Sequence, residues 1–142
     1  MPSHCHQQLV LWLARKMTSD GVIVAGFDGT AAQAGMWNDL PRPFTVNQLR
    51  PDVWGIARRA GGLVLGEAKT APDLATAHTR QQLRTFGRLK HQGRGEYATL
   101  YLAVPRSAAY ALDRTLTHAG LAGERHILCM HIPDCLIGHV EG

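Results

Sequence analysis

The chain has 142 residues, of which 45% are hydrophobic and 18% charged, a composition typical of folded globular proteins and unlike that of disordered ones. No apolar run reaches the ~20 residues that a membrane span requires, and the first residues lack the pattern of a signal peptide. We therefore expect one cytoplasmic domain, residues 1–142, that binds no membrane. Three cysteines are too few, and oddly numbered, for a disulfide framework.

The net charge of +4 is concentrated in the middle of the chain. Residues 42–106 contain eleven Lys and Arg residues against four Asp and Glu residues. Such an excess indicates an anionic partner.

The predicted elements follow one another as helix, three strands, helix, strand, helix and strand. Their ranges are 7–17 (helix), 22–27, 52–57 and 63–69 (strands), 74–91 (helix), 97–104 (strand), 107–119 (helix) and 125–132 (strand). Residues 28–42 predict a loop, and the glycine-containing turn at 58–62 predicts a hairpin. Asp73 is the predicted cap of the second helix. This alternation predicts an α/β fold with a central mixed sheet flanked by helices.

The third predicted strand, LVLGEAK at 63–69, ends in two charged residues. Alternate residues of a strand face the same side, so Glu67 and Lys69 project together, and the hairpin places Asp52 beside Glu67. Two close carboxylates repel each other, and a divalent cation such as Mg²⁺ relieves that repulsion. Lys69 could then orient an attacking water or offset developing charge. The alternative is a surface ion pair between Glu67 and Lys69 on a frayed strand end, remote from the core.

These residues resemble the signature of the PD-(D/E)XK nuclease superfamily. Pro51-Asp52 is separated by fourteen residues from Glu67-Ala68-Lys69. The segment Gln82-Leu-Arg-Thr-Phe86 is similar to the Q-h-x-x-Y element of lambda-exonuclease-like members, with Phe in place of Tyr. The resemblance covers residues 22–104, and the predicted order of elements matches the restriction-endonuclease-like core (αβββαβ).

The resemblance implies a Mg²⁺- or Mn²⁺-dependent deoxyribonuclease, either an endonuclease or a Holliday-junction-resolvase-like enzyme. It implies Asp52, Glu67 and the Ala68 carbonyl as metal ligands, Lys69 as the catalytic lysine, and Gln82 as a residue that holds the site. DNA is the implied partner. Because one small domain offers little surface for a duplex, we also expect a homodimer or a DNA-targeting partner protein.

One feature departs from the superfamily pattern. Many members carry a further acid on the first helix, whereas this helix has none before Asp20. His6, Gln7 or Asp28 could take that place. The departure leaves open a one-metal site, or a catalytically weak nucleic-acid-binding module of the same fold.

Several arginines are candidates for phosphate contacts. Arg50, Arg58 and Arg59 flank the strand that begins near Asp52, so we expect them to bind the DNA backbone. A second set on the predicted helix 74–91 lies nearly opposite Gln82, which indicates a solvated face. This second set is Arg80, Arg84 and Arg88.

A second group of metal-ligand types lies near the end of the sequence. Cys129, His131, Cys135 and His139 are residues that zinc accepts. The spacing lacks a C-x₂-C knuckle, and Cys129 lies within a predicted buried strand, which favours a core cysteine. The alternative is a zinc-stabilised interaction domain.

Overall fold

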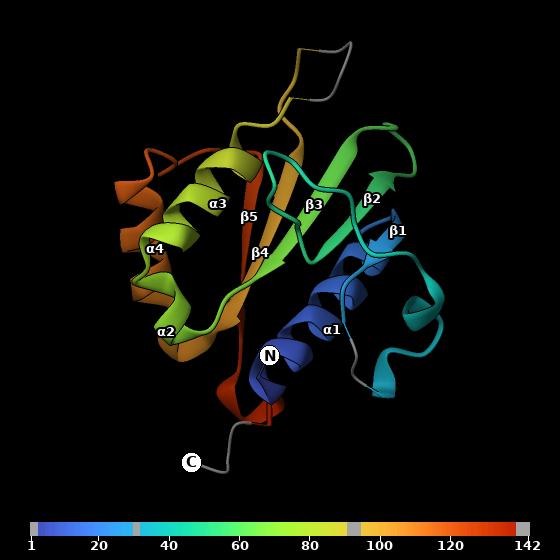
Figure 1. Ribbon diagram of the computed structural model, residues 1–142, viewed down its shortest axis with the longest axis horizontal. Coiled ribbons are helices and arrows are strands. Elements are labelled where there is room, and N and C mark those ends of the chain that lie inside the picture. The colour runs from blue at the N-terminus through green and yellow to red at the C-terminus, as the bar shows by residue number, and fades with distance from the viewer. Residues whose placement is uncertain (1–2, 30–31, 91–94, 139–142) are drawn as a thin grey trace.

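The computed structural model describes residues 3–29, 32–90 and 95–138, which form an α/β fold around a five-stranded mixed sheet (Figure 1). The strands lie in the sheet in the same order as in the chain. The elements are α1 (His4–Ser19), β1 (Val22–Phe27), η1 (Ala32–Asp39), β2 (Val53–Ala57), β3 (Leu63–Ala68), α2 (Ala71–Leu74), α3 (Ala77–Gly87), β4 (Thr99–Pro105), η2 (Arg106–Ala108), α4 (Ala109–His118), β5 (Ile127–Ile132) and η3 (Asp134–Leu136).

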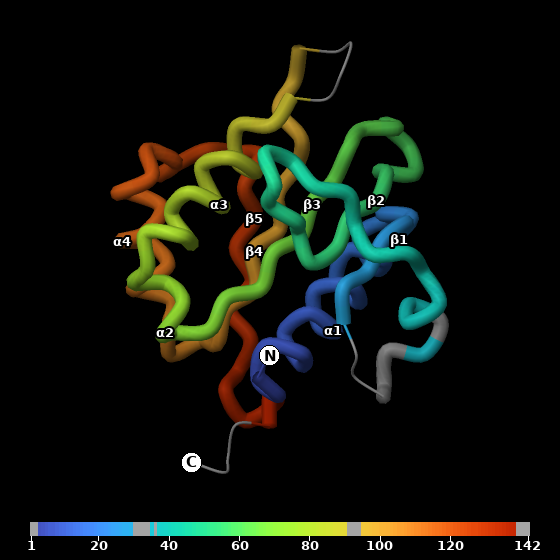
Figure 2. Tube along the Cα trace, in the orientation of Figure 1, coloured from blue at the N-terminus to red at the C-terminus, as the bar shows by residue number. Residues whose placement is uncertain are grey.

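The sheet is antiparallel from β1 to β3 and parallel from β3 to β5. A short turn at 58–62 joins β2 to β3, as an antiparallel pair allows. Parallel neighbours require a crossover, and here α2 and α3 connect β3 to β4 while α4 connects β4 to β5. Helix α1 covers one face of the sheet, whereas α3 and α4 cover the other (Figures 1 and 2).

The side chains of β3 alternate between two apolar clusters, one on each face of the sheet. Val64 and Ala68 belong to the cluster under α1, and Leu65 belongs to the cluster under α3 and α4. Gly66 lets α1 approach the strand closely, because a Cβ atom there would lie 2.9 Å from Leu13 Cδ2 and 2.9 Å from Met17 Sδ. The N-terminal helix therefore packs directly on the strand that carries Glu67.

The predicted order of helices and strands is confirmed, but the continuous helix predicted at 74–91 is wrong. The chain forms the single turn α2 and the separate helix α3, because each has its own N-terminal cap. Thr70 begins α2 in a capping box with Asp73, so Asp73 is not the cap residue that we predicted. The Thr76 hydroxyl accepts a hydrogen bond from Thr79 N–H (3.1 Å) and begins α3.

Two smaller predictions also need correction. Residues 28–42 are not entirely loop, since they contain η1, which is kinked at Gly35 where φ is +58°. Cys129 is exposed and not buried, because β5 is the last strand in the sheet order and is covered on fewer sides than β4. In the part of the chain that the structure describes, no helix has both the length and the apolar character of a membrane span.

Candidate functional site

The β2–β3 hairpin brings two acidic residues side by side at one end of the sheet. Val53 pairs with Gly66, so Asp52 and Glu67, one residue further along, lie side by side. Asp52 N–H donates a hydrogen bond to Glu67 Oε1 (3.2 Å), and Ala68 N–H donates to Asp52 Oδ2 (2.8 Å). The predicted position of Asp52 beside Glu67 is therefore confirmed.

Lys69 follows on the same face of β3 as Glu67. Its Nζ lies 3.1 Å from Glu67 Oε2, which confirms the alternation predicted from the sequence. The alternative of a surface ion pair remote from the core is wrong, because Glu67 and Lys69 are only 3% and 8% exposed. Helix α1 packs on the other face of β3 at Gly66, and α3 approaches Lys69 through Gln82.

Gln82 reaches the site from α3. It is buried, and its side-chain oxygen accepts a hydrogen bond from Lys69 Nζ. The same helix face buries Phe86 in the cluster under α3 and α4, so apolar packing sets the position of Gln82. The lysine amine is thus held between a carboxylate on its own strand and an amide on a helix.

Burial and the neighbouring charge of Asp52 raise the pKa of Glu67 well above its usual range. The ammonium of Lys69 opposes this shift but does not cancel it. Ionisation of a buried acid beside a second acid is electrostatically unfavourable. Such perturbed acids are found frequently at functional sites.

His6, in the first turn of α1, lies beside Asp52. Its Nε2 lies 3.4 Å from Asp52 Oδ2, and its Nδ1 is buried without a hydrogen-bond partner among the described residues. Burial lowers the pKa of His6, but the hydrogen bond to Asp52 and the charge of Asp52 outweigh burial and raise it. Of the three residues proposed from the sequence in place of a further acid, His6 therefore has a direct side-chain contact with Asp52.

The other two residues proposed from the sequence are Gln7 and Asp28. Gln7 is buried on α1. The carboxylate of Asp28 lies 3.7 Å from Arg42, although the Asp28 N–H donates a hydrogen bond to the Asp52 carbonyl (2.8 Å).

The predicted phosphate-binding arginines do not lie together. Arg50 is two residues before Asp52, and its Nε is buried with no hydrogen-bond partner in the described part of the chain. Arg58 and Arg59 are exposed in the turn between β2 and β3, at the end of the hairpin opposite Asp52 (Figure 1). The five residues of β2 separate Arg58 from Asp52, which in an extended strand corresponds to about 20 Å. Arg58 and Arg59 therefore flank β2 as predicted but lie far from the acids, and their contact with the DNA backbone stays a prediction.

The donor atoms at the site suit a hard divalent cation. Within the described ranges no three or more His, Cys, Asp or Glu residues are arranged as a metal cluster. Mg²⁺ does not need such a cage, since it commonly binds one or two carboxylates and keeps several waters. Asp52 and Glu67 provide two adjacent carboxylates, and the backbone of Ala68 lies between Glu67 and Lys69.

The zinc alternative has no such arrangement in its favour. Cys129 and Cys135 are exposed and carry free thiols, and His131 is exposed on β5. His139 lies outside the described residues.

Comparison with known families and structures identifies no relative from which a role could be transferred. No family model, no curated protein and no solved structure matches this chain. The function must therefore be argued from the site itself.

Proposed function

We propose that this chain is a Mg²⁺- or Mn²⁺-dependent deoxyribonuclease with a restriction-endonuclease-like fold of the PD-(D/E)XK type. The observation that carries the proposal is the buried arrangement of Lys69 between Glu67 and Gln82, with Asp52 in contact with Glu67. Asp52, Glu67 and Lys69 come from the end of a β-hairpin and Gln82 comes from α3, the second helix after it.

The roles follow from the chemistry of each side chain. Asp52 and Glu67 would hold the metal ion, which when bound polarises a phosphoryl oxygen and lowers the pKa of a bound water. Lys69 would orient the attacking water and offset the negative charge that develops on the phosphate. Gln82 would keep the Lys69 amine in place through its hydrogen bond. Water attacks phosphorus, the P–O bond to the leaving nucleotide breaks, and a proton passes to the leaving oxygen.

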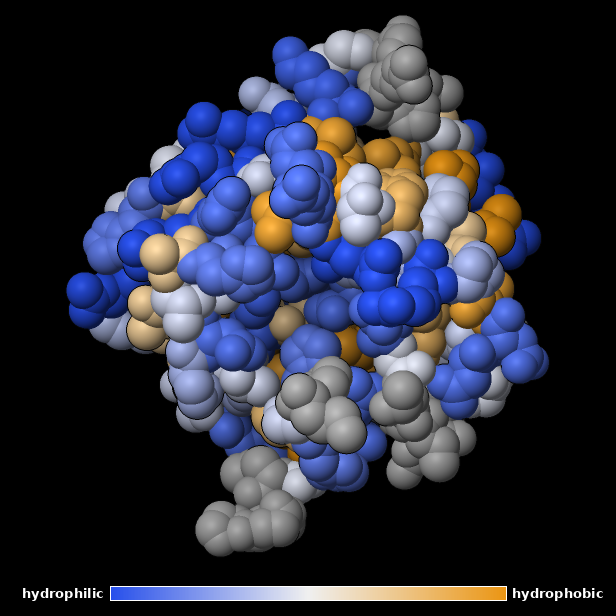
Figure 3. All heavy atoms as spheres, viewed as in Figure 1, coloured by the Kyte–Doolittle hydropathy of each residue, from blue (hydrophilic) through white to orange (hydrophobic). Residues whose placement is uncertain are grey.

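The proposed substrate is DNA, and Arg50 is the described arginine best placed for a backbone phosphate. It lies two residues from Asp52, and its buried Nε has no hydrogen-bond partner among the residues that the structure describes. Figure 3 shows mainly hydrophilic residues across the middle of the face that includes α3, and such a surface suits a charged polymer. A homodimer or a DNA-targeting partner would extend this surface along a duplex.

The decisive experiment is a plasmid-nicking assay in Mg²⁺, in Mn²⁺ and in a chelator. We expect metal-dependent nicking by the parent protein and loss of nicking in both Lys69→Ala and Asp52→Asn. Two variants at exposed residues, Lys16→Ala and Asp113→Asn, are the matched controls. Both should nick the plasmid as fast as the parent protein. Thermal melts show whether each variant is folded under the assay conditions. A folded Lys69→Ala protein that cuts at the parent rate would exclude the mechanism.

A nucleic-acid-binding module of the same fold is the second candidate. It is favoured by the first turn of α1, which contains no acidic residue and places His6 beside Asp52. This candidate predicts salt-dependent DNA binding with no nicking in either metal. Parallel binding and nicking assays on linear, circular, single-stranded and four-way-junction DNA distinguish the two functions.

A further inference from the structure

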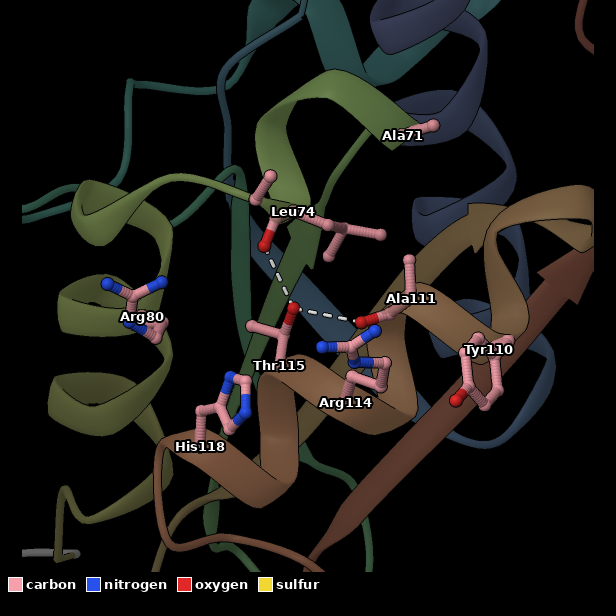
Figure 4. Close-up of a pocket in the computed structure, with 9 residues that line it drawn as sticks. Ala71, Leu74, Arg80, Tyr110, Ala111, Arg114, Thr115 and His118 are labelled. Carbon is pink, nitrogen blue, oxygen red and sulfur yellow. Dashed lines mark hydrogen bonds between the residues drawn. The ribbon is translucent and has the colours of Figure 1, made fainter.

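A second concave site lies between α2, α3 and α4. It is a cavity of about 360 Å³ (Figure 4). Arg80 of α3 lies on one side and Arg114 and His118 of α4 lie on the other, with His118 between the two arginines in this view. Tyr110 is at the edge of the same cavity. No residue of the proposed nuclease site lines it.

The walls of this pocket are held by hydrogen bonds. The buried Thr115 hydroxyl of α4 lies 2.8 Å from the Leu74 carbonyl of α2 and 2.9 Å from the Ala111 carbonyl (Figure 4). At the start of α2, the Thr70 hydroxyl donates to Asp73 Oδ2 (2.8 Å). A single-turn helix would otherwise fray, so these bonds fix the pocket before any ligand binds.

The basic groups of the pocket have no acidic partner in the described part of the chain. None of the ion pairs there involves Arg80, Arg114 or His118. The two nearest acids in sequence, Asp73 and Asp113, belong to the helices that form the walls but do not line the cavity.

Both of these acids act on other parts of the molecule. Asp73 accepts hydrogen bonds from Thr70, and its charge contributes, after burial and the charge of Asp134, to the raised pKa of Cys5. Burial and the charge of Asp113 raise the pKa of Cys129 on β5. No carboxylate of the described residues lines the pocket beside the two arginines, so their positive charge there attracts an anion.

We propose that this pocket binds the phosphate group of a nucleotide, with Arg80 and Arg114 as the contacting cations. Guanidinium groups present paired donors that match phosphate oxygens, and such charge-assisted bonds are strong. The volume lies near the lower end of ligand pockets, which suits a mononucleotide-sized group. The guanidinium of Arg114 lies over the Tyr110 ring, 6.0 Å from Cζ to the ring centroid, so Tyr110 helps to hold Arg114 at the edge of the cavity. This proposal does not depend on the nuclease assignment.

Binding measurements test the proposal directly. The probes are inorganic phosphate, deoxyadenosine monophosphate and a short single-stranded oligonucleotide, titrated in the absence of divalent metal. We expect the mononucleotide to bind with 1:1 stoichiometry and inorganic phosphate to compete with it. Arg80→Gln and Arg114→Gln should each weaken binding by about 10-fold or more, as expected for loss of one charge-assisted bond. The matched control Arg84→Gln, on the exposed face of α3, should bind like the parent.

The arms of the experiment also identify the source of the phosphate. The oligonucleotide could bind where the mononucleotide does not. If both pocket variants lose that binding, the pocket is a phosphate site for a nucleic-acid backbone. Failure of all three probes to bind the parent overturns the proposal. Equal binding to the parent and to both pocket variants also overturns it.

Discussion

The two halves of β3 bury side chains of opposite character. Val64 and Leu65, in the first half, are 3% and 0% exposed, and at the other end Glu67 is 3% exposed and is followed by the buried Lys69. Apolar burial stabilises a fold by about 25 cal/mol per Å². A buried ion pair, by contrast, costs desolvation that can equal or exceed its Coulombic gain. The first half of the strand is thus explained by stability, whereas the second half needs a functional explanation.

The largest expected effect comes from removing the cation at the charged end. Lys69→Met keeps the length of the side chain but leaves Glu67 without its nearest counterion. We expect the free energy of unfolding at pH 7, measured by urea denaturation in a chelator, to fall by up to about 3–5 kcal/mol. Proton uptake by Glu67 limits the loss.

The double variant Lys69→Met/Glu67→Gln should recover most of that stability, since no charge then remains unpaired on β3. The matched control is Lys16→Met, which breaks the exposed pair with Asp20 (3.2 Å) and should cost less than about 1 kcal/mol. If Lys69→Met were as stable as the parent, the buried pair would have no structural role.

At the apolar end, Leu65→Ala should lower the free energy of unfolding by about 2–5 kcal/mol. It removes a fully buried side chain and leaves a cavity under α3 and α4. Leu128→Ala, at a leucine that is 41% exposed on β5, is the control and should cost much less. Equal losses in the two variants would mean that the cluster under α3 and α4 is loosely packed.

The raised pKa of Glu67 predicts that stability depends on pH in a particular direction. Because the folded protein binds the Glu67 proton more tightly than the unfolded chain, this contribution is complete below the ordinary value of 4.5. It is lost as pH rises through the higher folded pKa, with a slope of at most about 1.4 kcal/mol per pH unit. Unfolding curves from pH 4 upward should show this decline in the metal-free parent and not in Glu67→Gln. If the difference in free energy of unfolding between the parent and Glu67→Gln did not change with pH, the raised pKa of Glu67 would be contradicted.

A smaller effect of the same sign is expected from His6. Its raised pKa means that the pair with Asp52 contributes fully below the ordinary value of 6.5 and is lost as pH rises through the folded pKa. Burial opposes the shift, so the effect should be less than that of Glu67. His6→Gln should therefore be less stable than the parent at pH 6, and the difference should shrink toward pH 9. A difference that grows with pH would show that His6 is not charged in this pair.

Local patterns in the sequence were sufficient to predict the order of helices and strands. They also predicted that Glu67 and Lys69 share one face of the strand. Strand alternation and the short turn at 58–62 determine those features within a few residues. The break between α2 and α3 was missed, because the apolar spacing of a helix continues across 75–76 while the Thr76 cap interrupts it.

Features that depend on distant segments could not be predicted. Lys69 is buried beside α3, which contacts it through Gln82. The contact of His6 with Asp52 spans more than forty residues of sequence. Likewise, Arg80 and Arg114 line one cavity although they belong to different helices, α3 and α4. The sequence contains these residues but no local pattern that joins them.

The connection between β2 and β3 also has a kinetic consequence. Among the described strands, only this neighbouring pair is joined by a turn as short as residues 58–62, so its loop closure costs the least entropy. We expect the hairpin to form early and to bring Asp52 and Glu67 together while water still screens their charges. The cost of desolvating them would arise later, when α1 and α3 dock. Stopped-flow kinetics should then show that substitutions in the turn slow folding, whereas substitutions at the start of α1 mainly speed unfolding.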